Sequence, residues 1–398
     1  MANILFLAHR IPYPPNKGDK IRSWNFLKRL AEDHTVHLGC FVDTVDDRQH
    51  EPFLNRHMAS TCFQYTSPLQ QKILSLRGLL SGQSLTENAY PHGKLRSFTR
   101  DLLESGDVDL VYLFSAATAS LLPPDIAVPV VCDFVDVDSE KWRAYAEVAS
   151  WPMSWIYGRE AVKLAEFEKS VSMLSERSVF VSRDEASLFA GMRPGKPGEI
   201  CGIPNGVDFE QFRSSRYESN VRAKNIVFTG AMDYLPNIEA VEWFCRDIWP
   251  EIRHEHPTAT FTIGGGPVPV RVKRLSAYPN VTVLGFVEDM AAVLSTGAIC
   301  VAPMLTARGI QNKILEAMAM AKPVVTTKLG NEGINAEHAK HLWLANSAKE
   351  FASSVSKLLA DPQVALKIGN SGQQFVKGHF SWDQSYEDLT SLIGEVLK

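Results

Sequence analysis

Short apolar segments alternate with segments of helical spacing in both halves of the chain, and this alternation constrains the fold most. Residues 3–8 (NILFLA) indicate a buried strand, residues 9–20 a proline-rich loop, and residues 35–41 a second strand after a helix. This order is typical of a parallel sheet covered by helices on both faces. The alternation restarts at residues 225–230 (NIVFTG). We therefore expect an α/β fold with two doubly wound, Rossmann-like domains.

A stretch rich in proline and glycine at residues 195–208 separates the two halves. Such a composition is typical of a link between domains, and Asn205-Gly206 predicts a tight turn within it. The chain of 398 residues is long enough for two domains. We place the first domain at residues 1–204 and the second at residues 205–380.

The composition excludes several classes of protein. A net charge of -4 gives no reason to expect a nucleic acid as partner. The six cysteines show no CxxC motif and no metal-ligand spacing, so we expect buried thiols in a reducing cytoplasm. No segment approaches the roughly 20 apolar residues of a membrane span, and residues 4–8 are too short for a signal peptide. We therefore expect a cytoplasmic protein whose contact with the cell membrane, if it has one, is peripheral.

Residues 308–327 (RGIQNKILEAMAMAKPVVTT) predict a loop, a helix and a short buried strand. Gly309 precedes the helix, whose N-terminus offers free N–H groups and a positive dipole end to a phosphate. Lys313 adds a charge in the first turn, and Glu316 can accept hydrogen bonds from a ribose diol. The segment predicts a site for a nucleoside diphosphate, although Lys313 and Glu316 also fit an ordinary solvated pair three residues apart.

Further candidates follow predicted strands, because ligands of doubly wound sheets bind at the carboxyl ends of the strands. His9 follows the first strand, and Gly18 lies in the loop after it. The neighbouring Asp19 is interpreted mainly as a helix cap. Gly265 lies in a glycine run after the strand at residues 260–264, where the backbone can approach a ligand closely.

Three carboxylates crowd the end of the strand at residues 128–134. They belong to Asp133, Asp136 and Asp138. Such a cluster is one pattern of a metal site. Strand alternation, however, places Asp133 on the opposite side from the other two, and Asp138 has a capping position at the next helix. We therefore expect no metal at this strand end.

Three motifs together resemble those of one enzyme family. They are residues 308–327, the IPNGVD segment at residues 203–208 and the FSWD segment at residues 380–383. They are similar to motifs of the retaining GT-B glycosyltransferases of the family 4 type. The C-terminal signature of that family has two glutamates flanking seven residues, followed by a "GKPVV" strand. Glu316 matches the second glutamate, and the first falls on Arg308.

The resemblance implies a GT-B fold, in which two domains face each other across a cleft and the last helix, residues 381–398, returns to the first domain. The second domain would bind the nucleotide sugar and the first the acceptor. Phe286 and Val287 would contact the base, and Asn237 stands where relatives often carry basic residues for the diphosphate. The residues implied to bind substrate are His9, Gly18, Asp133, Asn237, Gly265, Phe286, Val287, Gly309, Ile310 and Glu316.

The implied reaction is transfer of a hexose, with retention, from a nucleotide-diphosphate sugar of the UDP or GDP type to a hydroxyl acceptor. Arg308 and Lys313 would stabilise the leaving diphosphate, and Asp133 or Asp136 would orient the acceptor hydroxyl. Neither a metal nor a cofactor is implied. The chain is also similar to sugar transferases of bacterial exopolysaccharide clusters, which implies a lipid-linked glycan as acceptor at the inner face of the cell membrane.

Two segments are candidates for peripheral membrane contact. Residues 67–80 form an amphipathic segment with Lys72 and Arg77, and we expect this helix to face the core instead. Residues 149–157 are expected to form a loop that exposes Trp151 and Trp155.

Two other functions are alternatives to sugar transfer. A dehydrogenase is disfavoured, since no GxGxxG motif follows either the first strand or residues 225–230. A non-catalytic nucleotide-sugar-binding or scaffold protein on the same fold remains an alternative, because Arg308 and Asp233 depart from the family pattern.

Overall fold

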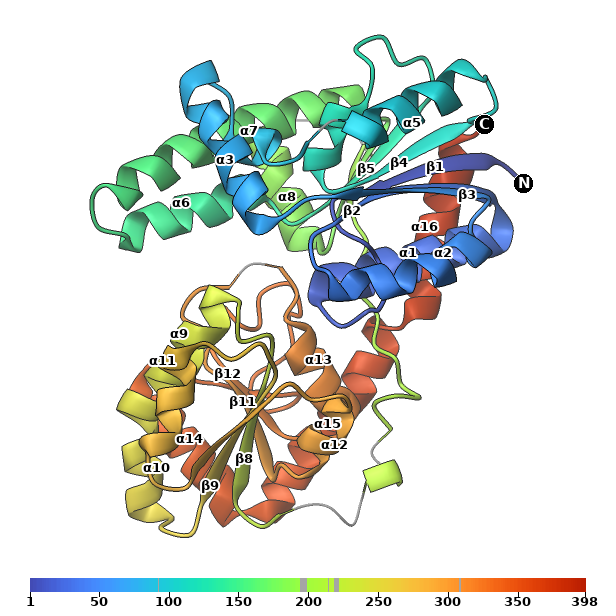
Figure 1. The fold of residues 1–398 in the computed structure, drawn as a ribbon. Coiled ribbons are helices and arrows are strands. Elements are labelled where there is room, and N and C mark those ends of the chain that lie inside the picture. Colours follow the sequence, from blue (N-terminus) through green and yellow to red (C-terminus); the bar gives the residue numbers. More distant parts are fainter. Residues whose placement is uncertain (92, 194–198, 214, 218–221, 308) are drawn as a thin grey trace. The chain divides into compact units, whose positions relative to one another are not determined.

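The computed structural model describes residues 1–91, 93–193, 199–213, 215–217, 222–307 and 309–398 (Figure 1). The chain divides into two compact units. Unit 1 comprises Met1–Pro204 and Tyr386–Lys398, and unit 2 comprises Asn205–Ser385. Each unit is built on one parallel sheet, so the prediction of two doubly wound α/β domains is confirmed.

The sheet of unit 1 has the strand order β3-β2-β1-β4-β5-β6-β7 and is parallel throughout. Its strands are β1 (Asn3–Ala8), β2 (Thr35–Val42), β3 (Ser60–Tyr65), β4 (Leu110–Phe114), β5 (Val130–Val135), β6 (Arg177–Phe180) and β7 (Ile200–Gly202). β1 and β4 are almost wholly buried, which explains why each reads as an uninterrupted apolar run. The rings of Phe6 and Tyr112 stack across these two strands at 5.0 Å.

Helices cover both faces of this sheet. α1, α2 and α16 lie together on one face (Figure 1), and Tyr386 of α16 donates a hydrogen bond to Asn25 of α1 at 2.9 Å. The helical elements of unit 1 are α1 (Gly18–Asp33), η1 (Asp46–His50), α2 (Glu51–His57), α3 (Pro68–Ser81), α4 (Leu85–Asn88), α5 (Gly93–Glu104), η2 (Ala116–Leu121), α6 (Asp138–Val148), α7 (Met153–Leu174), α8 (Arg183–Met192) and most of α16 (Trp382–Val396).

Unit 2 repeats the same topology. Its parallel sheet has the order β10-β9-β8-β11-β12-β13. The strands are β8 (Asn225–Thr229), β9 (Thr260–Gly264), β10 (Val281–Gly285), β11 (Ile299–Ala302), β12 (Val324–Thr326) and β13 (Trp343–Leu344). In both sheets the first strand lies in the middle, with its second and third strands on one side and its fourth on the other.

An aromatic cluster fills one side of the unit 2 sheet. The rings of Phe244 and Phe261 lie 4.4 Å apart, and Trp249 packs against both. The helical elements are α9 (Leu235–Trp243), η4 (Phe244–Ile248), α10 (Trp249–Glu255), α11 (Val270–Lys273), η5 (Arg274–Ala277), α12 (Met290–Ser295), α13 (Asn312–Ala319), α14 (Ala348–Ala360) and α15 (Pro362–His379). A capping box of Ser347 and Glu350 fixes the start of α14.

Two local predictions are wrong. The aromatic segment at residues 149–157 is mostly helical, because α7 already begins at Met153. The helix predicted to face the core, α3, exposes three apolar side chains instead, with Leu69 68%, Ile73 54% and Leu76 59% exposed. Periodicity identifies the residues that share a helix face, but it does not identify what that face meets.

Candidate functional site

The topology identifies where each unit can bind a ligand. In a doubly wound sheet, ligands bind outside the carboxyl ends of the strands where the strand order reverses. This point lies between β1 and β4 in unit 1 and between β8 and β11 in unit 2. Most of the site residues predicted from the sequence follow one of these strands or a neighbouring strand.

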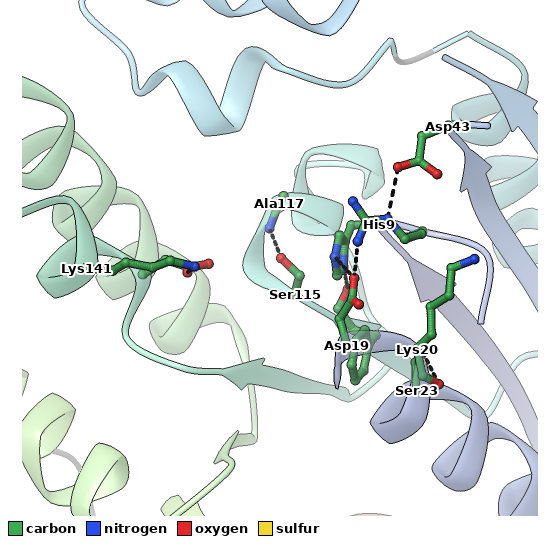
Figure 2. A network of polar contacts seen from close by, with 11 residues as sticks. His9, Asp19, Lys20, Ser23, Asp43, Ser115, Ala117 and Lys141 are labelled. Atoms are coloured by element: carbon green, nitrogen blue, oxygen red, sulfur yellow. Dashed lines mark hydrogen bonds and ion pairs between the residues drawn. The ribbon is translucent and has the colours of Figure 1, made fainter. Parts of the chain in front are cut away.

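In unit 1, a charged network joins the ends of β1 and β2 to the start of α1 (Figure 2). Arg10 donates from Nη1 to Asp19 Oδ2 at 2.6 Å and from Nε to Asp43 Oδ2 at 3.0 Å. His9 Nε2 lies 3.5 Å from the same Asp19 oxygen. Its other nitrogen, Nδ1, lies 3.4 Å from the carbonyl oxygen of Phe114 at the end of β4. His9 therefore spans the point where the strand order reverses.

Within this network Asp19 stays ionised and Arg10 stays protonated. Burial alone would raise the pKa of Asp19, but the hydrogen bond from His9 and the charge of Arg10 hold it well below its usual range. Burial alone would lower the pKa of Arg10, and the charges of Asp19 and Asp43 raise it instead. Asp19 is therefore an ionised hydrogen-bond acceptor rather than the plain helix cap expected from the sequence. Lys17 occupies the cap position of α1, and Gly18 is its exposed first residue.

Strained backbone marks the ends of the two neighbouring strands. Ser115, directly after β4, has φ of 77°, and Val135, the last residue of β5, has φ of 69°. A β-branched residue in this region is a genuine outlier, and such strain is concentrated at functional sites. The pairing of β5 with β6 shifts register between Asp133 and Val135. This irregularity sets the direction in which the next residue, Asp136, leaves the sheet.

Asp136 is a half-buried acid with one enclosed oxygen atom. Its Oδ1 atom makes no hydrogen bond to any described residue. Burial, followed by the charge of Glu185, raises the pKa of Asp136 to about 7. A carboxyl group with this pKa can hold or release a proton near neutral pH. The geometry is compatible with the predicted role of Asp136 toward an acceptor hydroxyl.

Asp133 lies in a different environment from Asp136, inside the core. Its side chain is 0% exposed, accepts a hydrogen bond from Arg22 Nε at 2.8 Å and another from the Tyr112 hydroxyl at 3.1 Å. Arg22 also donates to the carbonyl oxygen of Ile203 at 2.8 Å. Asp133 and Arg22 therefore form a buried ion pair, and the contacts of this pair join α1, β4 and β5.

In unit 2, glycines bring the strand ends close together. Gly230 N donates to the Gly264 carbonyl at 3.0 Å, and Gly265 N donates to the Gly285 carbonyl at 2.9 Å. Gly265 has φ of 127°, and a Cβ atom there would lie 2.0 Å from the Gly230 carbonyl oxygen. The close approach that requires glycine at position 265 is thus to the neighbouring backbone.

Lys313, in the first turn of α13, lies against the end of β8. Its Cε atom would be 3.2 Å from a Cβ atom at Gly230, and Asn237 Nδ2 would be 2.7 Å from that same point. Lys313 Nζ donates to the neutral amide oxygen of Gln311 at 2.9 Å. Asn237 Nδ2 donates to the Ala231 carbonyl at 2.8 Å, and its Oδ1 atom makes no hydrogen bond to a described residue. Lys313, Asn237 and Gly230 therefore converge where the strand order reverses.

The charges in this region are poorly solvated. Burial lowers the pKa of Lys313 to about 8, although Glu316 opposes the shift. Burial raises the pKa of Glu316 to about 7, although Lys313 opposes that shift. Both groups would gain from a ligand that supplies the opposite charge or a hydrogen bond. Lys313 and Glu316 are thus partly enclosed and do not form the solvated pair that the sequence also allowed.

The remaining predicted residues of unit 2 lie directly before α13 or directly after β10. Gly309, with φ of 61°, and Ile310 are buried just before α13. Phe286 follows β10 and is 73% exposed, while Val287 is half-buried. Arg308 lies outside the described residues.

The structure adds functional candidates that the sequence did not single out. Asp43 and Ser115 each follow a strand directly, which is the signal that identified His9. Among the described residues, no three His, Cys, Asp or Glu side chains form a group suited to a metal ion. No helix in the described part of the chain is long and apolar enough to span a membrane.

Residues 223–361, which make up most of unit 2, match the family model described as glycosyl transferases group 1. Unit 2 carries a glycosyl transferases group 1 domain. The domain contains Lys313, Glu316, Asn237 and the glycines at the strand ends. It therefore includes all the described candidate residues of unit 2.

One curated relative is an uncharacterized 44.6 kDa protein in the cps region of Klebsiella pneumoniae, 24% identical over 231 residues. The match covers 56% of this chain, and the chain spans only 57% of the length of that relative.

Solved structures resemble the whole chain. The Anabaena protein HepE in complex with UDP and glucose superposes with a TM-score of 0.67 at 15% identity, covering 99% of this chain and 100% of that one. The sucrose-phosphate synthase of Thermosynechococcus elongatus superposes with a TM-score of 0.71 at 18% identity, covering 100% and 99%. Likeness at such identities establishes the fold. The predicted GT-B fold and the resemblance to glycosyltransferases are confirmed.

Proposed function

We propose that this protein is a retaining glycosyltransferase that moves a hexose from a nucleotide-diphosphate sugar to a hydroxyl group of a glycan. The observation that carries the proposal is Lys313, a partly enclosed cation at the strand reversal of unit 2 whose Nζ contacts a neutral amide oxygen. A diphosphate would replace this neutral contact with a negatively charged one and so favour the protonated lysine.

Unit 2 would bind the donor. The diphosphate would lie against Lys313 and the N-terminus of α13, where backbone N–H groups and the helix dipole favour negative charge. Glu316, one turn further along α13, would accept hydrogen bonds from the ribose hydroxyls. Both Lys313 and the helix N-terminus would stabilise the charge that develops on the leaving diphosphate, without a metal ion. Arg308 would add a bidentate contact to the same phosphates.

Unit 1 would bind the acceptor at the ends of β1, β4 and β5. The ionised Asp19 and the neighbouring His9 provide fixed polar groups there. Asp136, with a pKa of about 7 and an oxygen atom without a described partner, would orient the attacking hydroxyl. The leaving phosphate would then take the proton of that hydroxyl, so that the reaction is balanced without a protein base.

The likeness to HepE, a protein solved with UDP and glucose, supports a donor of the UDP type. The relative from a cps region supports an acceptor that is an intermediate of polysaccharide synthesis, and we propose that this acceptor is lipid-linked.

The deciding experiment is calorimetric titration of the full chain with UDP, GDP and ADP. We expect UDP to bind most tightly, and we expect Glu316→Gln to weaken that binding about tenfold through loss of charged hydrogen bonds to the ribose. The matched control is Glu332→Gln, a half-buried glutamate of unit 2 outside the candidate residues.

Equal weakening by both glutamate variants would contradict the ribose contact, and failure of every nucleotide to bind would contradict the donor site. Tight binding without release of sugar to any hydroxyl, water included, would instead support a non-catalytic nucleotide-sugar-binding or scaffold protein. Hydrolysis of the bound UDP-sugar, measured by free UDP, separates these two outcomes.

A further inference from the structure

α3 presents an apolar face to solvent instead of to the core. Leu69, Ile73 and Leu76 are 68%, 54% and 59% exposed. Their spacing places them on one side of the helix. Lys72 and Arg77 are exposed beside them, and residues 67–82 contain no acidic residue. The outer side of α3 is therefore both apolar and positively charged.

A second exposed apolar row runs along the start of α7. Trp151 is 82% exposed, Trp155 62% and Val162 54%. Trp155 and Val162 are seven residues apart in α7 and therefore share one side of the helix, and Trp151 lies in the turn directly before it. The nearby Val148, at the end of α6, is 71% exposed. Exposure of several tryptophan side chains to water is unfavourable in free energy, and tryptophan is enriched at the boundary between water and lipid.

The two rows belong to one part of unit 1. Arg159 of α7 donates from Nη2 to the Gly78 carbonyl of α3 at 2.7 Å and to the Gln83 carbonyl at 3.1 Å. Arg159 thereby fixes the C-terminal end of α3 to α7. Figure 1 shows α3, α6 and α7 at one end of unit 1.

We propose that the outer sides of α3 and of the α6–α7 turn form a docking face for a membrane surface rich in anionic lipid. Lys72 and Arg77 would meet the lipid headgroups, while the leucine, isoleucine and tryptophan side chains would enter the boundary of the acyl chains. This binding mode requires apolar side chains that project from convex helices with basic flanks, which is what α3 provides.

Charge argues against a second copy of this chain as the occupant. A twofold contact through α3 would place Lys72 and Arg77 of one copy near the same residues of the other, with no acidic residue of α3 to neutralise them. An anionic lipid surface supplies the missing negative charge. The docking face does not depend on the proposed transferase chemistry, although it would bring the protein to a lipid-linked acceptor.

The test is co-sedimentation of the full chain with vesicles of phosphatidylcholine alone or of equal parts phosphatidylcholine and phosphatidylglycerol. We expect binding to the anionic vesicles only. The variant L69S/I73S/L76S and the variant W151S/W155S should each bind at least tenfold more weakly. K72Q/R77Q should lose about fivefold per removed charge at low salt. Thermal unfolding should be unchanged, since all these side chains are exposed.

The matched control is V270S/L366S, which removes two exposed apolar side chains of unit 2, 64% and 54% exposed. This variant should bind vesicles like the parent. Absence of binding to anionic vesicles, or equal loss in the control, would overturn the proposal. A dimer measured by light scattering that the α3 variant abolishes would assign the face to a second copy instead. UDP titration of the same variants keeps this test separate from the proposed function, because none of the changed residues belongs to the candidate donor site.

Discussion

Arg22 Nε donates to Asp133 Oδ2 at 2.8 Å, and both side chains are 0% exposed. A buried ion pair of this kind is strongly destabilised when one partner is removed, because the other is left charged in the core. We therefore expect Asp133→Ala to lower the free energy of unfolding by about 3–5 kcal/mol, as measured by urea denaturation.

The matched control for this change is Asp138→Ala, which removes a partly exposed carboxylate 3.8 Å from Lys141. Its cost should stay below about 1 kcal/mol, as for other solvated pairs. If Asp133→Ala retained parental stability and lost only sugar transfer, Asp133 would contact the acceptor after all.

The charge of Lys313 should contribute to the affinity for UDP. Lys313→Met keeps most of the side-chain volume and removes the charge, so affinity for UDP should fall about tenfold to a hundredfold, the value of one charged hydrogen bond. Stability should not fall, because burial disfavours the lysine charge in the free protein. Calorimetry and urea denaturation measure the two quantities. Lys340→Met, at an exposed lysine of unit 2, should change neither; a similar loss of affinity there would indicate nonspecific attraction.

The affinity for UDP should also depend on pH through Lys313. Its pKa in the free protein is about 8, because burial lowers it from 10.5. A diphosphate binds the protonated form, so the association constant should decline as pH rises above about 8, by up to about tenfold per pH unit. The decline should be absent in Lys313→Met. The same pH profile in both proteins would show that another group controls binding.

The strands and helices that fill the interior could be read from the sequence, whereas the edge strand β3 could not. β1 and β4 are continuous apolar runs because both faces of the sheet are covered. β3 (STCFQY) alternates buried and half-buried residues at the sheet edge and was not predicted. The amphipathic pattern of α3 was recognised, but the pattern is the same for a helix that faces the core and for one that faces a partner.

Some residues of the candidate site could also be selected from the sequence, and the contacts of others could not. His9, Asp136 and Lys313 follow strands or begin a helix, and this local signal was sufficient to select them. The role of Asp133 depends on Arg22, 111 residues away in the chain, and no local pattern reports such a partner. The same holds for Asp19, whose contacts with His9 and Arg10 depend on how the loop after β1 folds back onto α1.

Asp136 should make the stability of the protein depend on pH. Its folded-state pKa is about 7, raised from 3.8 first by burial and then by Glu185. Between these values the folded state binds more protons than the unfolded state, so the contribution of Asp136 to stability declines as pH rises from about 4 to 7. Asp136→Asn removes this dependence. The free energy of unfolding of the variant, relative to the parent, should therefore be higher at pH 8 than at pH 4.5, as measured by urea denaturation.

Glu168 and Glu316 also have raised pKa values, of about 8 and about 7, caused first by burial, but they are present in both proteins and cancel in the difference. Parallel pH curves for parent and variant would show that Asp136 is solvated or paired in solution. The same variant separates a role in the reaction from a role in folding. If Asp136 orients the acceptor, its substitution should lower the rate of sugar transfer at every pH and leave the affinity for UDP unchanged. Loss of UDP affinity together with transfer would instead indicate that the substitution distorts more than the acceptor side.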